Sequence, residues 1–199
     1  DRLRGDRVHA PLDGQVQGSI AEGGTRLRLL ALPKPRGLVH GRQASIASGF
    51  DPQTMDPHAL ALLYQSRIYT QVYDALLGRD EQFRLEPALA MSWQAMSPTT
   101  WRFKLRPGVS FHDGSPFTAD DAVFSIERAL GPTSQRAFQL KGVTGARKVD
   151  DLTLDVMLAT PDAVLPEKFV GLAMVSKAWC LKHGVEKAHR RDRDVVPQV

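Results

Sequence analysis

The segment 101–106, which reads WRFKLR, constrains the fold more than any other part of the sequence. Every second side chain in it is apolar, and those between are basic. Successive side chains of a β-strand point to opposite faces, so this period of two predicts a strand with one face on a core and one in water. Pro107-Gly108 ends the pattern, and Asp113-Gly114 predicts a turn.

A helix is predicted directly after this turn. Thr118 suits the N-cap position, and Asp121 stands three residues later, where its carboxylate can bond back to the cap. Apolar residues then recur at helical spacing until Gly131-Pro132, which predicts the helix end. None of these residues is arranged for catalysis, so we interpret the strand and the helix as scaffold.

Turn residues and apolar periodicity predict further elements along the chain. They are a short strand from Ala44 to Ser48, a helix from Asp56-Pro57 to about Asp74, a short strand at Leu76-Leu77, a hairpin with arms at 143–149 and 152–158, a short helix over 163–169, and a helix from Met174 to His183 that Gly184 ends.

Composition and charge narrow the function classes. The chain has 199 residues, of which 42% are hydrophobic and 24% charged, as in an ordinary globular protein. The net charge of +4 arises from residues 1–44, where no aromatic residues alternate with the basic ones as a nucleic-acid stacking surface requires. Cys180 is the one cysteine, which excludes an internal disulfide and a multi-cysteine zinc site.

Patterns of catalytic chemistry are missing from the sequence. His112-Asp113 and Asp120-Asp121 lack the spacing that places metal ligands on one face, and we interpret them as turn and helix-start residues. Ala47-Ser48-Gly49 lacks the leading glycine of a nucleophile elbow, and no nucleotide-binding glycine motif occurs. We therefore expect a protein that is not an enzyme and that has no cofactor and no metal.

The order of motifs from Leu89 to Leu130 resembles the bacterial solute-binding proteins of family 5, the peptide, dipeptide and nickel receptors of ABC importers. The matching pieces are Ser92-Trp93, Trp101-Arg102-Phe103-Lys104-Leu105-Arg106, Gly108-Val109-Ser110-Phe111, His112-Asp113-Gly114 and Phe117-Thr118-Ala119-Asp120-Asp121-Ala122-Val123. The loop 51–58 and the lead-in 86–90 are also typical of the family.

The resemblance implies a mixed α/β fold, the N-terminal part of a two-lobed, class II-like periplasmic-binding-protein fold truncated before the second lobe. It divides the chain into an irregular basic leader at 1–43, which it does not cover, the N-terminal lobe at 44–187 and an atypical charged tail at 188–199. We interpret the tail as a truncation or frameshift and expect the chain to be a partial receptor.

By the same resemblance, the protein is the substrate-binding component of an ABC importer. It is expected to capture peptides or a similar small solute by closure of two lobes and to dock on the permease subunits. The implied location is periplasmic, peripheral to the membrane only through the transporter, with no nucleic-acid partner. No stretch reaches the roughly 18 apolar residues that cross a membrane, and no secretory signal pattern is evident.

The resemblance places the ligand on the loop after the first strand, the start of the first helix and the segment after Gly131-Pro132. The residues implied are Ser48, Gly49, Phe50, Leu63, Tyr64, Arg136 and Phe138. We favour Phe50 and Phe138 as aromatic contacts, with core packing or a solvated side chain as the alternative for each. The ligand's identity cannot be carried over, because the charged residues that grip peptide termini lie mainly in the second lobe.

Two other function classes stay open. An interaction or structural module without solute binding would use the exposed surface of the lobe and should form oligomers. A nucleic-acid-binding protein would use the basic leader, and its salt-dependent binding to DNA should disappear when residues 1–44 are removed.

Overall fold

The computed structural model describes residues 29–30, 43–44 and 53–189. The chain divides into two units, Asp1–Asp51 and Pro52–Val199. In the first unit, the described residues are β1 (Leu29–Leu30) and β2 (Gln43–Ala44), which pair antiparallel. The predicted strand from Ala44 to Ser48 and the basic leader otherwise lie outside the described residues.

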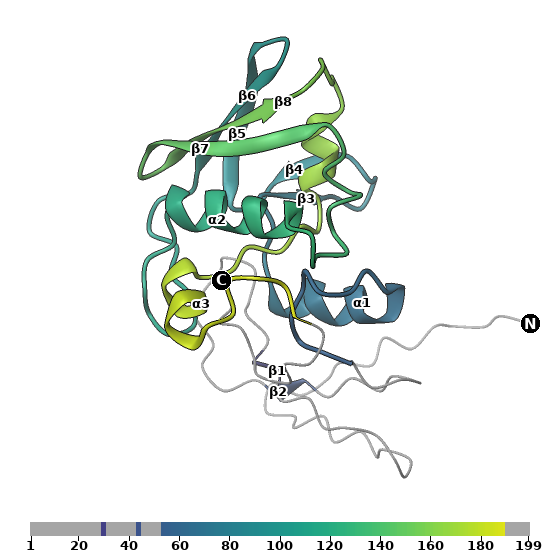
Figure 1. Ribbon diagram of the computed structural model, residues 1–199, viewed down its shortest axis with the longest axis vertical. Coiled ribbons are helices and arrows are strands. Elements are labelled where there is room, and N and C mark those ends of the chain that lie inside the picture. The colour runs from purple at the N-terminus through teal and green to yellow at the C-terminus, as the bar shows by residue number, and fades with distance from the viewer. Residues whose placement is uncertain (1–28, 31–42, 45–52, 190–199) are drawn as a thin grey trace, which may run out of the picture. The chain divides into compact units, whose positions relative to one another are not determined.

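The second unit is built on an antiparallel sheet with one face covered by a helix. Its strands are β5 (Ala90–Ser97), β6 (Thr100–Leu105), β7 (Val143–Asp150) and β8 (Thr153–Leu158), in the order β5-β6-β8-β7. Figure 1 shows α2 (Ala119–Leu130) lying along one face of this sheet. The fold of this unit is therefore mixed α/β, as predicted.

Shorter elements surround this sheet and helix. They are α1 (Leu63–Val72), β3 (Leu77–Arg79), β4 (Leu85–Pro87), the 3-10 helix η1 (Leu165–Phe169) and α3 (Lys177–His183). Isolated bridges join Ala75 to Ala173 and Leu77 to Val170, so the chain after η1 runs beside the chain after α1. This pairing brings α1 to the same side of the unit as the segment 170–173.

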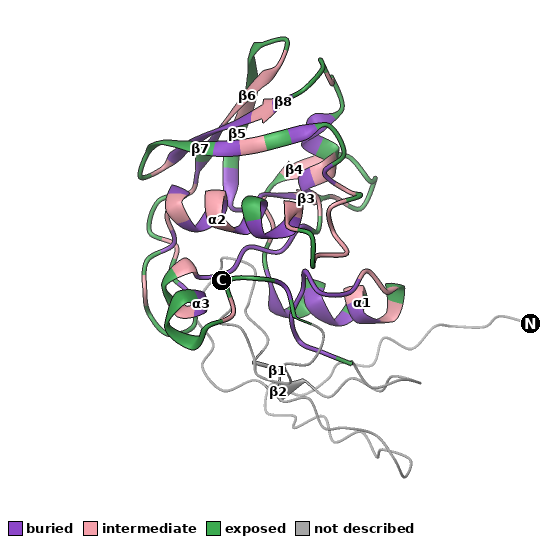
Figure 2. Cartoon of the chain, in the orientation of Figure 1, coloured by how far each residue is buried: buried purple, intermediate pink, exposed green. Residues whose placement is uncertain are grey.

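The alternation predicted for segment 101–106 is confirmed. Phe103 is fully buried in the core, and its ring meets that of Phe169 edge-on with 5.1 Å between centroids. On the opposite face of β6, Arg102 bonds Asp155 of β8 through two nitrogens, at 2.7 and 2.9 Å. Figure 2 shows the buried residues concentrated where α2 meets the sheet and the segment 172–176.

The predicted start of α2 is confirmed by individual hydrogen bonds. The backbone N–H of Thr118 donates to Asp121 Oδ2 at 3.0 Å, which is the return bond of a capping box. Asp121 Oδ1 also accepts from the backbone N–H of Lys177 at 3.0 Å, so one carboxylate fixes the starts of α2 and α3. Gly131 ends α2 as expected.

Three predicted helix starts are wrong. The helix expected from Pro57 begins at Leu63, because other side chains hold the loop before it in an irregular path. The helix expected over 163–169 is the shorter η1. The helix expected from Met174 begins at Lys177, because the Met174 N–H donates instead to the Asp74 carbonyl. Strand β5, which is mostly exposed, was not predicted.

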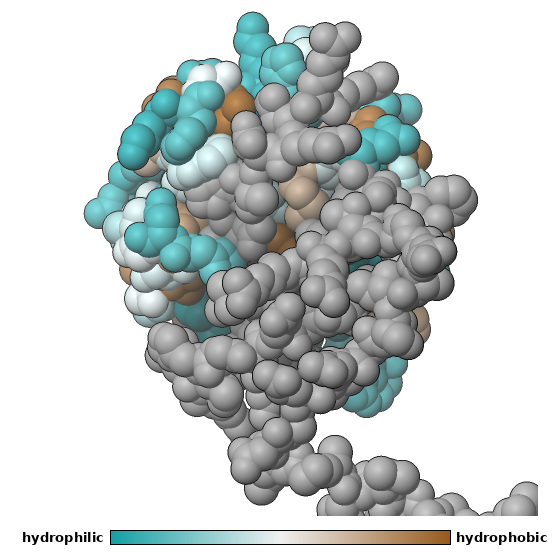
Figure 3. Space-filling model, turned by 90° about the horizontal axis from the view of Figure 1, so that it is seen from below, coloured by the Kyte–Doolittle hydropathy of each residue, from teal (hydrophilic) through white to brown (hydrophobic). Residues whose placement is uncertain are grey.

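The surface seen in Figure 3 is mostly hydrophilic where described residues form it, with small separate hydrophobic spots. None of the helices in the described part of the chain is long and apolar enough to cross a bilayer.

Phe103→Ala should lower the free energy of unfolding by about 3–5 kcal/mol, because it empties a fully buried site beside Phe169. Urea unfolding followed by tryptophan fluorescence measures the change. The matched control is Phe83→Ala, at a side chain that is 76% exposed, and it should stay within about 0.5 kcal/mol of the unaltered protein. Equal losses for the two variants would contradict this assignment of the core.

Candidate functional site

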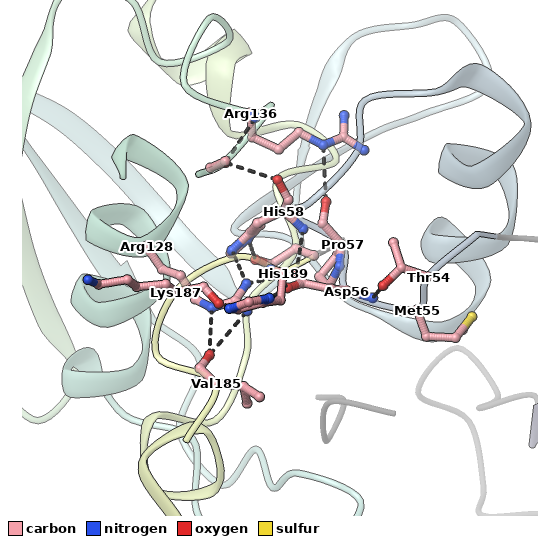
Figure 4. A network of polar contacts seen from close by, with 12 residues as sticks. Thr54, Met55, Asp56, Pro57, His58, Arg128, Arg136, Val185, Lys187 and His189 are labelled. Atoms are coloured by element: carbon pink, nitrogen blue, oxygen red, sulfur yellow. Dashed lines mark hydrogen bonds and ion pairs between the residues drawn. The ribbon is translucent and has the colours of Figure 1, made fainter. Parts of the chain in front are cut away.

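Residues 54–58 form an irregular loop whose backbone carbonyls are held by side chains of other segments (Figure 4). The Tyr69 hydroxyl donates to the Thr54 carbonyl at 2.9 Å, and the Tyr73 hydroxyl donates to the Met55 carbonyl at 2.8 Å. Both tyrosines belong to α1 or its C-cap. A buried polar backbone must find partners, and here side chains replace a helix or a sheet.

The other side of this loop is held by the segment after α2. Arg136 Nε donates to the Pro57 carbonyl at 3.2 Å. The His58 carbonyl accepts from the Ser134 hydroxyl and from the Gln135 backbone N–H, both at 3.0 Å. The loop therefore fixes the segment 134–136 as much as that segment fixes the loop.

Asp56 and Arg128 form a buried ion pair at the centre of the loop. Arg128 Nη1 and Nη2 donate to Asp56 Oδ1 and Oδ2 at 2.8 and 2.6 Å, and both side chains are almost fully buried. This two-bond arrangement is the strong form of an arginine–carboxylate contact. Burial alone would raise the pKa of Asp56, but the bond and charge of Arg128 hold it below its ordinary value.

His58 is fully buried against this pair. Its Nε2 lies 2.9 Å from the Ala173 carbonyl, which can only accept, so Nε2 carries the proton. Nδ1 then accepts from Arg128 Nη1 at 3.1 Å. Burial and the charge of Arg128 lower the pKa of His58 to about 4, against a smaller opposing effect of Asp56. The ring is therefore neutral near pH 7.

Arg128 also holds the far end of the described chain. Its Nε donates to the Val185 carbonyl at 3.3 Å, and its Nη2 donates to the Lys187 carbonyl at 3.1 Å. The backbone N–H of His189 donates to Asp56 Oδ2 at 2.9 Å. Gly184, in the left-handed region at φ 67°, turns the chain out of α3 and toward Arg128.

One face of α2 carries this polar attachment. Asp121 bonds the backbone of Lys177, and the Ser125 hydroxyl accepts from the Val175 N–H at 2.9 Å. Arg128 continues the row, so residues at positions i, i+4 and i+7 of one helix bind the segment 175–187. The apolar face of the same helix packs on the sheet.

A cavity of about 210 Å³ lies between α1 and the segment 170–173. Its polar lining residues include Ser66, Tyr69, Thr70, Tyr73, Arg136 and Gln139. Arg136 Nη2 donates to the Ser66 hydroxyl at 3.1 Å, which orients the guanidinium at the wall. Burial lowers the pKa of Arg136, yet an arginine keeps its charge in proteins.

The guanidinium of Arg136 lacks a carboxylate partner within ion-pair distance among residues 53–189. A half-buried arginine in this state is suited to bind a carboxylate or another planar anion through two parallel bonds. The same described residues contain no cluster of three or more histidine, cysteine or acidic side chains that could hold a metal ion.

The structure places the predicted ligand residues at different sites. Of the seven, Ser48, Gly49 and Phe50 lie outside the described residues. Arg136 lines the cavity. Leu63 and Phe138, 75% and 71% exposed, and the half-buried Tyr64 do not line it. Whether any of the seven contacts a ligand stays a prediction.

Sequence reasoning did not find the polar network of Asp56, His58 and Arg128. Asp56 was expected only at the start of a helix, and neither His58 nor Arg128 was named as a candidate site residue. The available signal was the row Asp121, Ser125 and Arg128, since three polar residues at helical spacing beside an apolar stripe indicate a second buried face.

The free energy of unfolding should fall as the pH is lowered from about 6.5 to about 4, because of His58. The unfolded chain protonates this ring near its ordinary pKa of 6.5, whereas the folded protein keeps it neutral until about 4. The unfolded state therefore binds more protons than the folded state across this window. The free energy of unfolding falls by a total on the order of 3 kcal/mol.

Urea unfolding at several pH values across the window measures this effect, with His58→Gln as the comparison. Glutamine keeps a donor toward the Ala173 carbonyl but does not titrate. The variant should lose most of the pH dependence that the unaltered protein shows between these limits. The same slope in both proteins would assign the effect to other groups.

The sequence of this chain matches a known protein family and several known proteins. The family model of bacterial extracellular solute-binding proteins, family 5 Middle, matches residues 84–192. The periplasmic oligopeptide-binding protein OppA of Escherichia coli is 27% identical over 153 residues, which is 66% of this chain and 28% of OppA. The HTH-type transcriptional regulator SgrR of Yersinia enterocolitica is 34% identical over 103 residues, or 51% of this chain and 18% of SgrR.

The fold of this chain also matches a solved structure of a relative. Haemophilus influenzae OppA, in complex with the peptide RPPGFSPFR, matches with a TM-score of 0.64 and 26% identity, over 68% of this chain and 31% of that one. The chain thus spans less than a third of the length of these relatives. The predicted fold class, mixed α/β and part of a two-lobed periplasmic-binding-protein fold, is confirmed. The chain belongs to family 5 of the bacterial extracellular solute-binding proteins.

Proposed function

We propose that this chain is part of the substrate-binding component of an ABC importer, which captures peptides or a similar solute and passes it to permease subunits. Family membership supports the class. The observation that carries the ligand chemistry is Arg136, a half-buried cation on the wall of a cavity without a carboxylate partner among the described residues. Binding and release require no covalent step.

The ligand group that suits Arg136 is a carboxylate. Every unmodified peptide carries one at its C-terminus, and a guanidinium meets it with two parallel bonds. The cavity of about 210 Å³ is smaller than the roughly 300–1,000 Å³ of a pocket that encloses a whole ligand. We therefore assign to it one end of the solute, with the remainder enclosed by other parts of the protein.

The other predicted contacts remain part of this proposal. Phe138 and Leu63 present exposed apolar surface that a solute side chain can cover. Ser48, Gly49, Phe50 and Tyr64 keep the role that the family resemblance gives them. We also propose that the protein acts in the periplasm and reaches the membrane only through the permease.

A tripeptide with a free C-terminal carboxylate should bind this chain weakly but specifically, with its effects centred on Ser66, Arg136 and Gln139. We expect saturable changes in their amide resonances in an NMR titration. The same tripeptide with a C-terminal amide should bind roughly tenfold more weakly, because it loses the charge-assisted pair.

Arg136→Gln should abolish the preference for the acid over the amide. The matched control is Arg84→Gln, since the Arg84 side chain is 74% exposed and lies outside the cavity. Equal affinities of acid and amide for the unaltered chain would contradict the assignment of Arg136 as the ligand's counter-ion.

A second candidate function is solute sensing within a transcriptional regulator, which the similarity to SgrR favours. The capture step is the same in both candidates, and the location differs. Cell fractionation decides between them: recovery with periplasmic proteins supports the receptor, and recovery with cytoplasmic proteins supports the sensor.

A further inference from the structure

Two segments far apart in the sequence meet at a single buried ion pair. The loop 54–58 follows closely on the first unit, which ends at Asp51. The segment 185–189 closes the described chain at the other end. Both are attached to Asp56–Arg128: the His189 N–H reaches Asp56 across 133 positions of sequence.

Neither segment has regular secondary structure to hold it in place. Arg128 donates to two carbonyls of the segment 185–189. It also forms a fork, two parallel hydrogen bonds to the two carboxylate oxygens of Asp56 in the loop 54–58. The guanidinium is itself fixed by helix α2 and by His58 Nδ1, whose ring is tied to the Ala173 carbonyl. One rigid group therefore holds both segments (Figure 4).

We propose that the Asp56–Arg128 pair is a clasp that ties the loop 54–58 and the segment 185–189 to one point, so that both segments move together with α2 as one body. In this role Arg128 is a positioning residue. An arginine can satisfy both segments at once, because its planar group offers five donors in a fixed arrangement.

The clasp also reaches the cavity. Pro57 and His58 follow Asp56 directly, and their carbonyls accept bonds from Arg136 Nε and from the Ser134 hydroxyl. Displacement of the loop would therefore displace the Arg136 guanidinium. This consequence, unlike the clasp itself, rests on the proposed function, because it concerns the ligand's counter-ion.

Amide hydrogen exchange tests the clasp without any ligand. In the unaltered protein, the segments 54–58 and 185–189 should become exchangeable in one shared opening. In Arg128→Lys, which keeps the charge but loses the fork, exchange should accelerate in both segments by about tenfold or more. Strands β6 and β8 should exchange as before.

The matched control is Arg102→Lys, since Arg102 makes the same two-bond fork, with Asp155 on the outer face of the sheet. It should leave both segments unchanged. Acceleration in one segment alone, or equal acceleration throughout the chain, would overturn the proposal. Asp56→Asn, which keeps the shape of the side chain, takes the place of Arg128→Lys if that variant does not fold.

If neither variant folds, the unaltered protein decides, because separate openings of the two segments would refute a common clasp. The acid-over-amide preference of the tripeptide, measured in the same variants, reports on Arg136 independently. An unchanged preference in a variant whose exchange is accelerated in both segments would overturn the clasp's role in the cavity. Normal exchange coupling in a protein that binds no peptide would leave the clasp standing and refute the proposed function.

Discussion

The candidate site depends on one buried ion pair, that of Asp56 and Arg128. Removal of two charges from water costs several kcal/mol per ion, and the pair is stable only because additional bonds satisfy what remains of both groups. Those bonds come from His58, Val185, Lys187 and His189. The same contacts that stabilise the two buried charges also set the path of the loop 54–58 and of the segment 185–189.

Helix α2 links the core to this network, because it carries two buried faces. Its apolar face packs on the sheet with Phe103 and its neighbours, and its polar face binds the segment 175–187. The loop 54–58 is fixed in turn, and the segment 134–136 with Arg136 is bonded to that loop. The position of the cavity's cation thus follows from the position of a scaffold helix.

Local signals in the sequence were sufficient for strand β6 and for the start of helix α2, but not for strand β5. The alternation at 101–106 and the capping box of Thr118 and Asp121 involve residues within a few positions of one another, so the sequence alone predicts them. The loop 54–58 was predicted as a helix start because Asp56-Pro57 has the right composition. Its actual path depends on Tyr69, Arg128 and Arg136, partners that lie up to about 80 positions away.

The candidate site could be predicted from the sequence only in part, for the same reason. Arg136 was named from the family resemblance, and the structure places it on the cavity wall. Gln139, three residues later, lines the same cavity and was not named. Neither the burial of Arg128 nor the neutrality of His58 can be inferred from single residues, because each is a property of the whole cluster.

A double-mutant cycle measures the central interaction most directly, through the free energies of unfolding of Asp56→Asn, Arg128→Gln and the double variant. The account predicts that the two changes are strongly non-additive, with a coupling free energy of more than about 1 kcal/mol, because each single change leaves one buried partner unsatisfied. Additivity within about 0.5 kcal/mol would contradict it.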